Sequence, residues 1–244
     1  MRPTKIVIIG AASACFGPGC IRDAINCEGI RGSRLVLVDI DNEALAVMAR
    51  FAHTVNDAAD AGLVIEHTTD RTQALPDAEF VITCIAIKRN DLWKLDWEIP
   101  LKYDIKHVLG ENGGPGGLSH SLRNIPVILD ICRDMDKLCP DAWLLNFTNP
   151  ESRMCLAISK YSQIKAAGLC HGLREGGEFI RKLCAIEPAE RLRLDPAGLN
   201  HFAWAVHLTI DGRDGWPVFR AALKRHGARS VSYTHLTLPT TPYV

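Results

Sequence analysis

The chain has 244 residues, of which 47% are hydrophobic, enough for one large α/β domain and part of another. Lysine plus arginine and aspartate plus glutamate number 28 each, so no net charge favours binding to nucleic acid or to an anionic membrane. No run of about 18 apolar residues predicts a transmembrane helix. Nine cysteines, an odd number without a C-x-x-C pair, favour a reducing, cytoplasmic location over a disulfide framework.

Apolar runs alternate with amphipathic helices along the first part of the chain, which predicts a parallel sheet with helices on its faces. A helix over 18–27 follows the first strand, and two later helices carry apolar residues at helical spacing, one around Leu45 and one around Ile128. This order is typical of a Rossmann-type domain. Strands are predicted at 5–9, 34–38, 63–67, 80–85, 143–147 and 165–170.

The pattern changes beyond about residue 172. A helix over 176–184 and a strand over 204–210, which ends at an Asp-Gly turn, indicate the opening elements of a second domain. The sequence therefore predicts a Rossmann domain over residues 1–172 and the beginning of a C-terminal α+β domain over 173–229.

The last fifteen residues, 230–244, contain no Asp, Glu, Lys or Arg but four Thr and two Pro. An edge strand with a proline-rich exit would fit this composition. The segment also resembles translated adaptor sequence at the ends of proteins assembled from short sequencing reads. We expect a non-native tail, a natural chain cut near Arg229, and a second domain that is mostly missing.

The segment after the first strand has features of a dinucleotide-binding loop. Gly10 suits the tight turn, whereas Ala12 stands where a second glycine would let the backbone approach a pyrophosphate. Asp39, at the end of the second strand, is placed to accept hydrogen bonds from ribose hydroxyls, which favours NAD over NADP. A plain β–α turn is the alternative for the loop, and a helix N-cap is the alternative for Asp39. The candidate cofactor contacts are Gly10, Ala12, Ser13, Phe16 and Asp39.

A thiol ends the sixth predicted strand, and two imidazoles come after it. Cys170 ends that strand, His171 comes next, and His201 lies in a later Gly-x-Asn-His turn. Sulfur and imidazole nitrogen suit Mn²⁺, Fe²⁺, Co²⁺, Ni²⁺ or Zn²⁺ and are poor ligands for Mg²⁺ or Ca²⁺. Two protein ligands leave positions for substrate hydroxyls. The spacing alone leaves open a core thiol and an unrelated imidazole.

Four ordered segments carry a resemblance to a known family. They are 113–117 (GGPGG), 146–150 (NFTNP), 168–172 (GLCHG) and 198–201 (GLNH). With the N-terminal loop and the VDID segment at 38–41, they resemble glycoside hydrolase family 4 over residues 1 to about 225. The α-galactosidase, α-glucosidase and α-galacturonidase branch looks most similar. The resemblance implies a fold like lactate and malate dehydrogenases, NAD, and a divalent metal, usually Mn²⁺.

The resemblance also implies roles for individual residues. Cys170 and His201 match the metal ligands, Asn149 matches a sugar contact, and His171 matches the proposed general acid. A backbone hydrogen bond for His171 and a simple turn at Asn149 are the alternatives. Glu111 precedes the Gly-Pro-Gly-Gly segment, where many relatives carry an Asp two residues later, so the resemblance assigns it no role.

The implied reaction is hydrolysis of O-glycosidic bonds in α-glycosides (galactoside, glucoside or galacturonide) by oxidation at C3, elimination, water addition and re-reduction. The family's C2 base lies beyond residue 229, so we expect the 244-residue chain to bind NAD weakly and to hydrolyse little or nothing. We expect a homo-oligomer at full length, without nucleic acid or membrane partners. The alternatives are a 2-hydroxy-acid dehydrogenase with His171 as proton acceptor and no metal, or a non-catalytic NAD-binding fragment.

Overall fold

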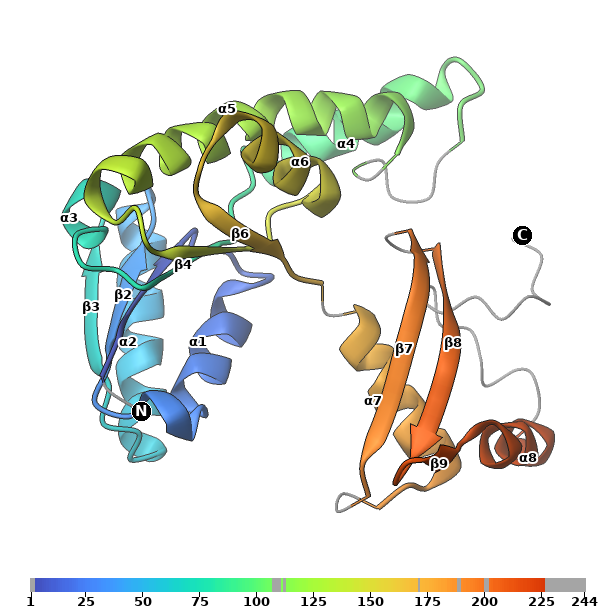
Figure 1. Ribbon diagram of the computed structural model, residues 1–244. Coiled ribbons are helices and arrows are strands. Elements are labelled where there is room, and N and C mark those ends of the chain that lie inside the picture. The colour runs from blue at the N-terminus through green and yellow to red at the C-terminus, as the bar shows by residue number, and fades with distance from the viewer. Residues whose placement is uncertain are drawn as a thin grey trace. The chain divides into compact units, whose positions relative to one another are not determined.

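The computed structural model describes residues 3–106, 111, 113–170, 172–187, 190–199 and 202–226. The chain divides into two compact units, Met1–Leu169 and Cys170–Val244 (Figure 1). The domain limits expected from sequence, with a boundary between residues 172 and 173 and a separate tail from residue 230, stay a prediction.

The first unit is a six-stranded sheet in which every neighbouring pair of strands is parallel. The strand order is β3-β2-β1-β4-β5-β6, the order of a doubly wound Rossmann sheet, which confirms the predicted fold class. The strands are β1 (Lys5–Ile9), β2 (Arg34–Val38), β3 (Val64–Thr68), β4 (Phe80–Thr83), β5 (Trp143–Asn146) and β6 (Lys165–Gly168).

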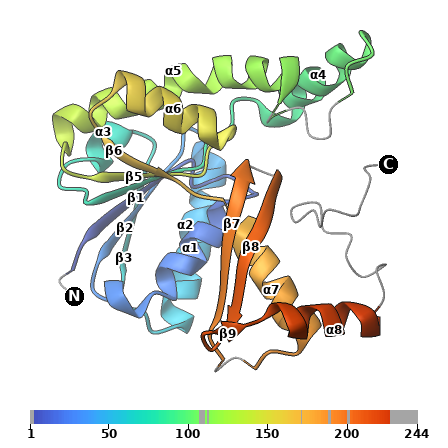
Figure 2. The same ribbon diagram turned by 45° about the vertical axis from the view of Figure 1, so that its right-hand side comes forward.

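Helices cover both faces of this sheet (Figures 1 and 2). Helices α1 and α2 pack on one face, and α3, α5 and α6 pack on the other. Helix α4 packs along α5. The helices are α1 (Gly17–Ile25), α2 (Asn42–Ala58), α3 (Arg71–Ala74), α4 (Arg89–Leu101), α5 (Gly114–Leu138) and α6 (Glu151–Tyr161), with a short 3-10 turn at Glu28–Ile30.

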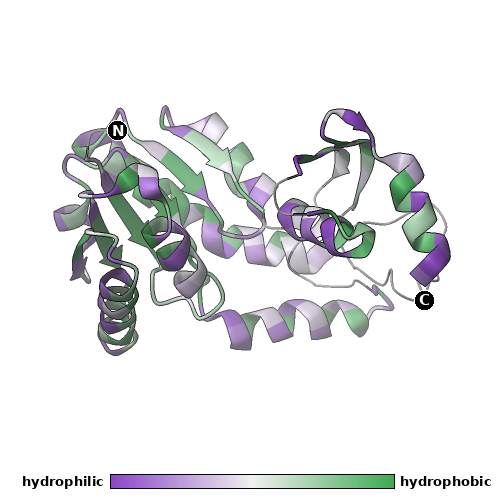
Figure 3. Cartoon of the chain, turned by 90° about the horizontal axis from the view of Figure 1, so that it is seen from below, coloured by the Kyte–Doolittle hydropathy of each residue, from purple (hydrophilic) through white to green (hydrophobic). Residues whose placement is uncertain are grey.

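The central strands are buried on both sides, which explains their continuous apolar sequence. Along β1, Ile6 and Ile8 pack with α1 and α2, whereas Val7 and Ile9 pack with α5 and α6. The hydrophobic colouring of these strands is evident in Figure 3. Each such side chain stabilises the fold by roughly 1.5–3 kcal/mol, so the position of the strand ends is strongly fixed.

Strand β6 differs from the expectation. It ends at Gly168 rather than at Cys170, and as an edge strand it is exposed or half-buried along its length rather than buried. Leu169 continues the pairing by one hydrogen bond, from its N–H to the Asn146 carbonyl (2.9 Å). Cys170 therefore lies in the segment that leaves the sheet edge.

The second unit holds a three-stranded antiparallel sheet with two helices, which agrees with the predicted opening of an α+β domain. Asp211 and Gly212 both have positive φ (47° and 77°), as the two-residue hairpin between β8 and β9 requires. Strand β7 was not recognised in the sequence. The elements are α7 (Gly172–Cys184), β7 (Leu192–Leu199), β8 (Phe202–Ile210), β9 (Arg213–Asp214) and α8 (Trp216–His226). No helix among the described residues is long and apolar enough to span a membrane.

Candidate functional site

The loop after β1 is a turn that only glycine can make. Gly10 has φ +90°, and a Cβ there would stand 2.7 Å from the Cys84 carbonyl oxygen. A Cβ on Gly17 would stand 2.2 Å from the Ala11 carbonyl oxygen. The loop is therefore tight at both ends, and helix α1 begins directly behind it, with Pro18 in its first turn.

Asp39 holds this loop against the end of β2. The Ala12 N–H donates to Asp39 Oδ2 (2.9 Å), and the Asp41 N–H donates to Oδ1 (3.1 Å). The N-cap of α2 is Asp41, whose carboxylate accepts from the Glu43 and Ala44 N–H groups, so the N-cap role considered for Asp39 is wrong. Asp39 is half-buried, and a carboxylate has lone pairs left for ribose hydroxyls.

The other loop residues fold the turn onto the neighbouring strand end. The Phe16 N–H donates to Ser13 Oγ (3.3 Å), and the Gly17 N–H donates to the Ser13 carbonyl (2.7 Å). The Phe16 ring lies against that of Phe147, with centroids 5.9 Å apart. The candidate cofactor loop is thus joined to the segment that follows β5.

That segment is built on buried polar side chains. Thr83 Oγ1 donates to Asn146 Oδ1 (3.0 Å), and Asn146 Nδ2 donates to the Thr148 carbonyl (3.0 Å). The Ile85 N–H donates to Thr148 Oγ1 (3.1 Å). Asn146 and Thr148 are almost fully buried, and these bonds satisfy them. They form a rigid platform from which the next residue, Asn149, projects.

Asn149 is held at both its main chain and its side chain. Its carbonyl accepts from Asn124 Nδ2 (3.0 Å) on α5, and its own Nδ2 donates to Glu111 Oε1 (3.1 Å). Its peptide bond to Pro150 is cis. Asn149 is half-buried, in contrast to the buried Asn146 and Thr148. The sequence-predicted sugar contact is thus a side chain fixed at the carboxyl edge of the sheet.

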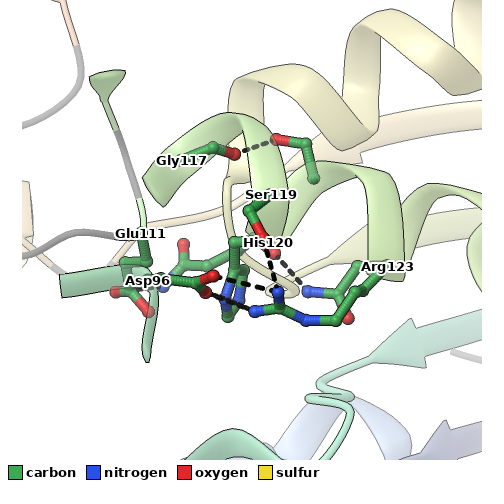
Figure 4. Close-up of polar contacts among 9 residues, drawn as sticks. Asp96, Glu111, Gly117, Ser119, His120 and Arg123 are labelled. Atoms are coloured by element: carbon green, nitrogen blue, oxygen red, sulfur yellow. Dashed lines mark hydrogen bonds and ion pairs between the residues drawn. The ribbon is translucent and has the colours of Figure 1, made fainter. Parts of the chain in front are cut away.

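A buried ionic cluster lies between α4 and α5 (Figure 4). Arg123 donates to both oxygens of Asp96, with 2.9 Å between Nη1 and Oδ1, and to Ser119 Oγ (2.9 Å). His120 Nδ1 lies 3.3 Å from Asp96 Oδ2. Asp96, His120 and Arg123 are called the α4–α5 cluster below. Asp96 and His120 are 5% and 2% exposed, so their polar groups depend on partners within the protein.

Burial and charge shift the protonation of this cluster. Burial opposes ionisation of Asp96, but hydrogen bonds from Arg123 and Ser119 and the guanidinium charge outweigh it, so the pKa of Asp96 lies below its usual value. Burial lowers the pKa of His120 despite the opposing effects of Asp96 and Glu111. The Asp96 carboxylate is therefore ionised and the His120 imidazole neutral near pH 7.

Of the predicted metal ligands and the predicted general acid, only Cys170 lies among the described residues. Cys170 carries an exposed free thiol, as ligation requires. His171 and His201 fall outside the described residues. Within the described part of the chain, no three His, Cys, Asp or Glu side chains gather as a metal site would. The fit of a metal thus rests on the chemistry of the predicted donors, and the roles of Cys170, His171 and His201 stay predictions.

The α4–α5 cluster and Asn124 were missed in the sequence, although a signal exists. His120 and Asn124 lie at helical spacing before the buried Ile128 and Ile131, so they continue the core-facing stripe of α5 with polar residues. Polar residues on a buried stripe need partners, and α4 supplies one with the buried Asp96.

Sheet order, glycine turn and acidic strand end define the chain as a doubly wound Rossmann protein. Comparison with known proteins identifies the family within this fold class. The profile described as "Family 4 glycosyl hydrolase" matches residues 5–186, and the chain belongs to this family. The resemblance drawn from the four sequence segments is thereby confirmed.

Two curated relatives illustrate the relationship. The chain is 40% identical over 237 residues to an alpha-glucosidase of Erwinia rhapontici, covering 96% of this chain and 52% of that protein. It is 34% identical over 226 residues to an alpha-galactosidase of Bacillus subtilis (strain 168), covering 90% and 51%. The chain spans about half the length of the curated relatives it matches.

Two solved structures have a similar fold. A 6-phospho-beta glucosidase from Thermotoga maritima, solved with manganese, NAD⁺ and glucose-6-phosphate, matches with a TM-score of 0.77 and 26% identity, over 91% of this chain and 54% of that chain. A lactate dehydrogenase from Eimeria maxima matches with a TM-score of 0.67 and 17% identity, over 96% and 66%. The second likeness confirms the expected dehydrogenase-like fold and carries no argument about function.

Proposed function

We propose that the protein hydrolyses O-glycosidic bonds of α-glycosides with NAD and a divalent metal, Mn²⁺ or a similar transition metal. Membership of glycosyl hydrolase family 4 supports glycoside hydrolysis over the dehydrogenase alternative. The structural observation that carries the proposal is that Gly10, Asp39 and Asn149 follow β1, β2 and β5, all at the carboxyl edge of one parallel sheet. Ligands of open α/β sheets bind at that edge.

The residues of the first unit fit a dinucleotide. Gly10 makes the tight turn after β1 against the Cys84 carbonyl, and Asp39 would accept ribose hydroxyls. Ala12 carries a methyl group where a second glycine would let the backbone approach a pyrophosphate, but its N–H donates to Asp39 Oδ2 and fixes the loop. Asn149 would contact the sugar hydroxyls beside the nicotinamide.

The second unit would supply the metal ligands and the acid. Cys170 and His201 would hold the metal, and their thiolate and imidazole suit Mn²⁺ and its transition-metal neighbours. His171 would give a proton to the departing glycosidic oxygen, a task that imidazole performs near neutral pH. When bound, NAD⁺ would supply a hydride acceptor and the metal would supply a Lewis acid.

The finer properties are proposals as well. The relatives support a glucoside or galactoside, with a galacturonide as a further candidate. All nine cysteines are free thiols, which supports a reducing, cytoplasmic setting. We also propose a homo-oligomer for the full-length protein, and that oxidation at C3 accompanies each turnover.

The proposal is tested with the full-length protein and 4-nitrophenyl α-glucoside or α-galactoside. We expect cleavage that needs NAD⁺ and Mn²⁺, stops with a chelator, and leaves no NADH behind. Glycoside cleavage without added or bound NAD would contradict it. NADH that accumulates with a 2-hydroxy acid, without glycoside cleavage, would favour the dehydrogenase instead.

The role of Cys170 has its own test. Calorimetric titration with Mn²⁺ should show binding to the wild-type protein and at least tenfold weaker binding to Cys170→Ser, because a thiolate ligand is lost. Cys27→Ser, which changes another exposed thiol, serves as the control. Equal affinity in Cys170→Ser and wild type would remove Cys170 from the site.

A further inference from the structure

The Asn149 side chain has two ends with opposite chemistry, and the structure shows which end faces the protein. The Nδ2 group donates to Glu111 Oε1 (3.1 Å), so Oδ1 is turned away from Glu111. In general an Asn amide can be flipped, and only its partners decide the orientation. A carboxylate has no proton to donate. Glu111 therefore binds Asn149 only when Nδ2 faces it, because Oδ1 in that place would find no donor.

Glu111 is itself a buried residue, only 6% exposed. It lies beside Asp96 and His120 of the α4–α5 cluster (Figure 4), and its charge acts on His120. A buried carboxylate is costly unless it is hydrogen-bonded. The amide of Asn149 supplies one such bond, so Glu111 and Asn149 depend on each other.

The main chain of Asn149 is held by a side chain of helix α5. Asn124, 1% exposed, donates from Nδ2 to the Asn149 carbonyl. With backbone and amide both held, Asn149 has little freedom to turn. Asn124 Oδ1 has no hydrogen-bond partner among the described residues. With its Nδ2 engaged by Glu111, Asn149 has Oδ1 as its other polar side-chain atom, and an amide oxygen only accepts hydrogen bonds.

We propose that Glu111 is a positioning residue that locks the Asn149 amide so that its Oδ1 faces the substrate as a hydrogen-bond acceptor. The α4–α5 cluster lies beside Glu111. The inference rests on the proposed function insofar as Asn149 meets a sugar. Such a site selects a substrate hydroxyl group, which can donate its proton to Oδ1. An ether or a deoxy carbon at that position has no such proton and would be disfavoured.

Exchanging the carboxylate and the amide between positions 111 and 149 tests, in the full-length protein, whether Glu111 locks the Asn149 amide. In Glu111→Gln the new amide accepts either orientation of Asn149, so kcat/KM should fall roughly 5- to 100-fold, in line with the loss of one buried hydrogen bond. Asn149→Asp alone sets two carboxylates against each other and should lose more. In the double variant Glu111→Gln/Asn149→Asp the new amide donates to the new carboxylate, whose second oxygen again faces the substrate.

The sign of the Glu111→Gln effect therefore reverses with the background. It should lower kcat/KM in the wild type and raise it at least tenfold in the Asn149→Asp background, with NAD affinity unchanged. Glu98→Gln makes the same chemical change on the exposed side of α4 and should change nothing in either background. A Glu111→Gln effect of equal size and direction in both backgrounds would overturn the proposal.

A second measurement stands apart from catalysis. In the 244-residue chain labelled with ¹⁵N-asparagine, the Asn149 side-chain signals are identified by their loss in Asn149→Ala. Exchange of these NH₂ protons with water should become about tenfold faster in Glu111→Ala and stay unchanged in Glu98→Gln. Unchanged exchange in Glu111→Ala would refute the lock. If exchange accelerates but the full-length enzyme cleaves no glycoside, the lock stands and the proposed function fails.

Discussion

Gly10 shows how much of the site depends on a single missing methyl group. Gly10→Ala would place a Cβ 2.7 Å from the Cys84 carbonyl oxygen, at a φ of +90°. We expect a loss of stability of at least 1–2 kcal/mol, roughly the cost of that backbone conformation, and NAD binding at least tenfold weaker. Thermal melting and NAD titration measure the two effects.

Gly19→Ala is the matched control for this prediction. A Cβ on Gly19, inside α1, meets no heavy atom within 4 Å. Alanine is favoured over glycine in a helix by about 0.5–1 kcal/mol, so this variant should be neutral or more stable. If both variants bind NAD equally well, the tight turn at Gly10 has no part in cofactor binding.

His120 makes a prediction about pH. Its pKa is lowered by burial in the folded chain, so between about pH 6.5 and that lower value the unfolded chain binds the additional proton. Stability should therefore fall as the pH drops below about 6.5. Asp96, whose pKa is also lowered, adds a further loss below about pH 4, as the pH falls through its folded pKa.

The charged neighbours of His120 are Asp96, Arg123 and Glu111. His120→Gln keeps a polar side chain at this place without the titration. Its urea-unfolding free energy should be lower at pH 7.5 but change less between pH 7.5 and pH 5.5 than that of the wild type. An identical change with pH in both proteins would show that His120 does not titrate during unfolding.

At the level of elements, two aspartates at the end of β2 have separate tasks. Asp41 caps α2, so Asp41→Ala should lower stability by about 1 kcal/mol, with little effect on NAD affinity. Asp39 binds the cofactor loop, so Asp39→Ala should weaken NAD binding at least tenfold. Denaturant unfolding and NAD titration separate the two. A stability loss from Asp39→Ala with unchanged NAD affinity would contradict this division.

The strands and helices of the sheet could be predicted because their burial repeats along the sequence. Helix α2, for example, buries Leu45, Ala49 and Ala52 at helical spacing. Helix α4 was missed because its buried residues include a carboxylate, Asp96, and Pro100, while apolar side chains such as Trp97 remain exposed. Its partner is an arginine on another helix, and local periodicity carries no sign of such a contact.

The site residues, too, could be predicted where the signal is local and not where it depends on contacts between elements. Gly10 and Asp39, which follow strands, could be chosen from sequence because parallel strands bring their ends to one edge. Asn149 was chosen from the family resemblance. Glu111 could not be assigned, because its role depends on where α5 packs against the segment after β5. The limits of β6 were also mistaken, since its Ala-Ala-Gly sequence does not mark where an edge strand ends.

At the level of the whole molecule, the chain spans about half the length of the curated relatives it matches. The first unit carries Gly10, Asp39, Asn149 and Glu111, and Cys170 opens the second.

The proposed glycoside cleavage proceeds through oxidation of the sugar rather than by direct displacement. Oxidation at C3 makes the C2 proton acidic, so that proton is removed and later replaced from solvent. The direct measurement is turnover of an aryl α-glycoside by the full-length protein in D₂O with NAD⁺ and Mn²⁺, followed by mass spectrometry and NMR of the released sugar. We predict one deuterium at C2 of every product molecule. A released sugar without deuterium at C2 would contradict it.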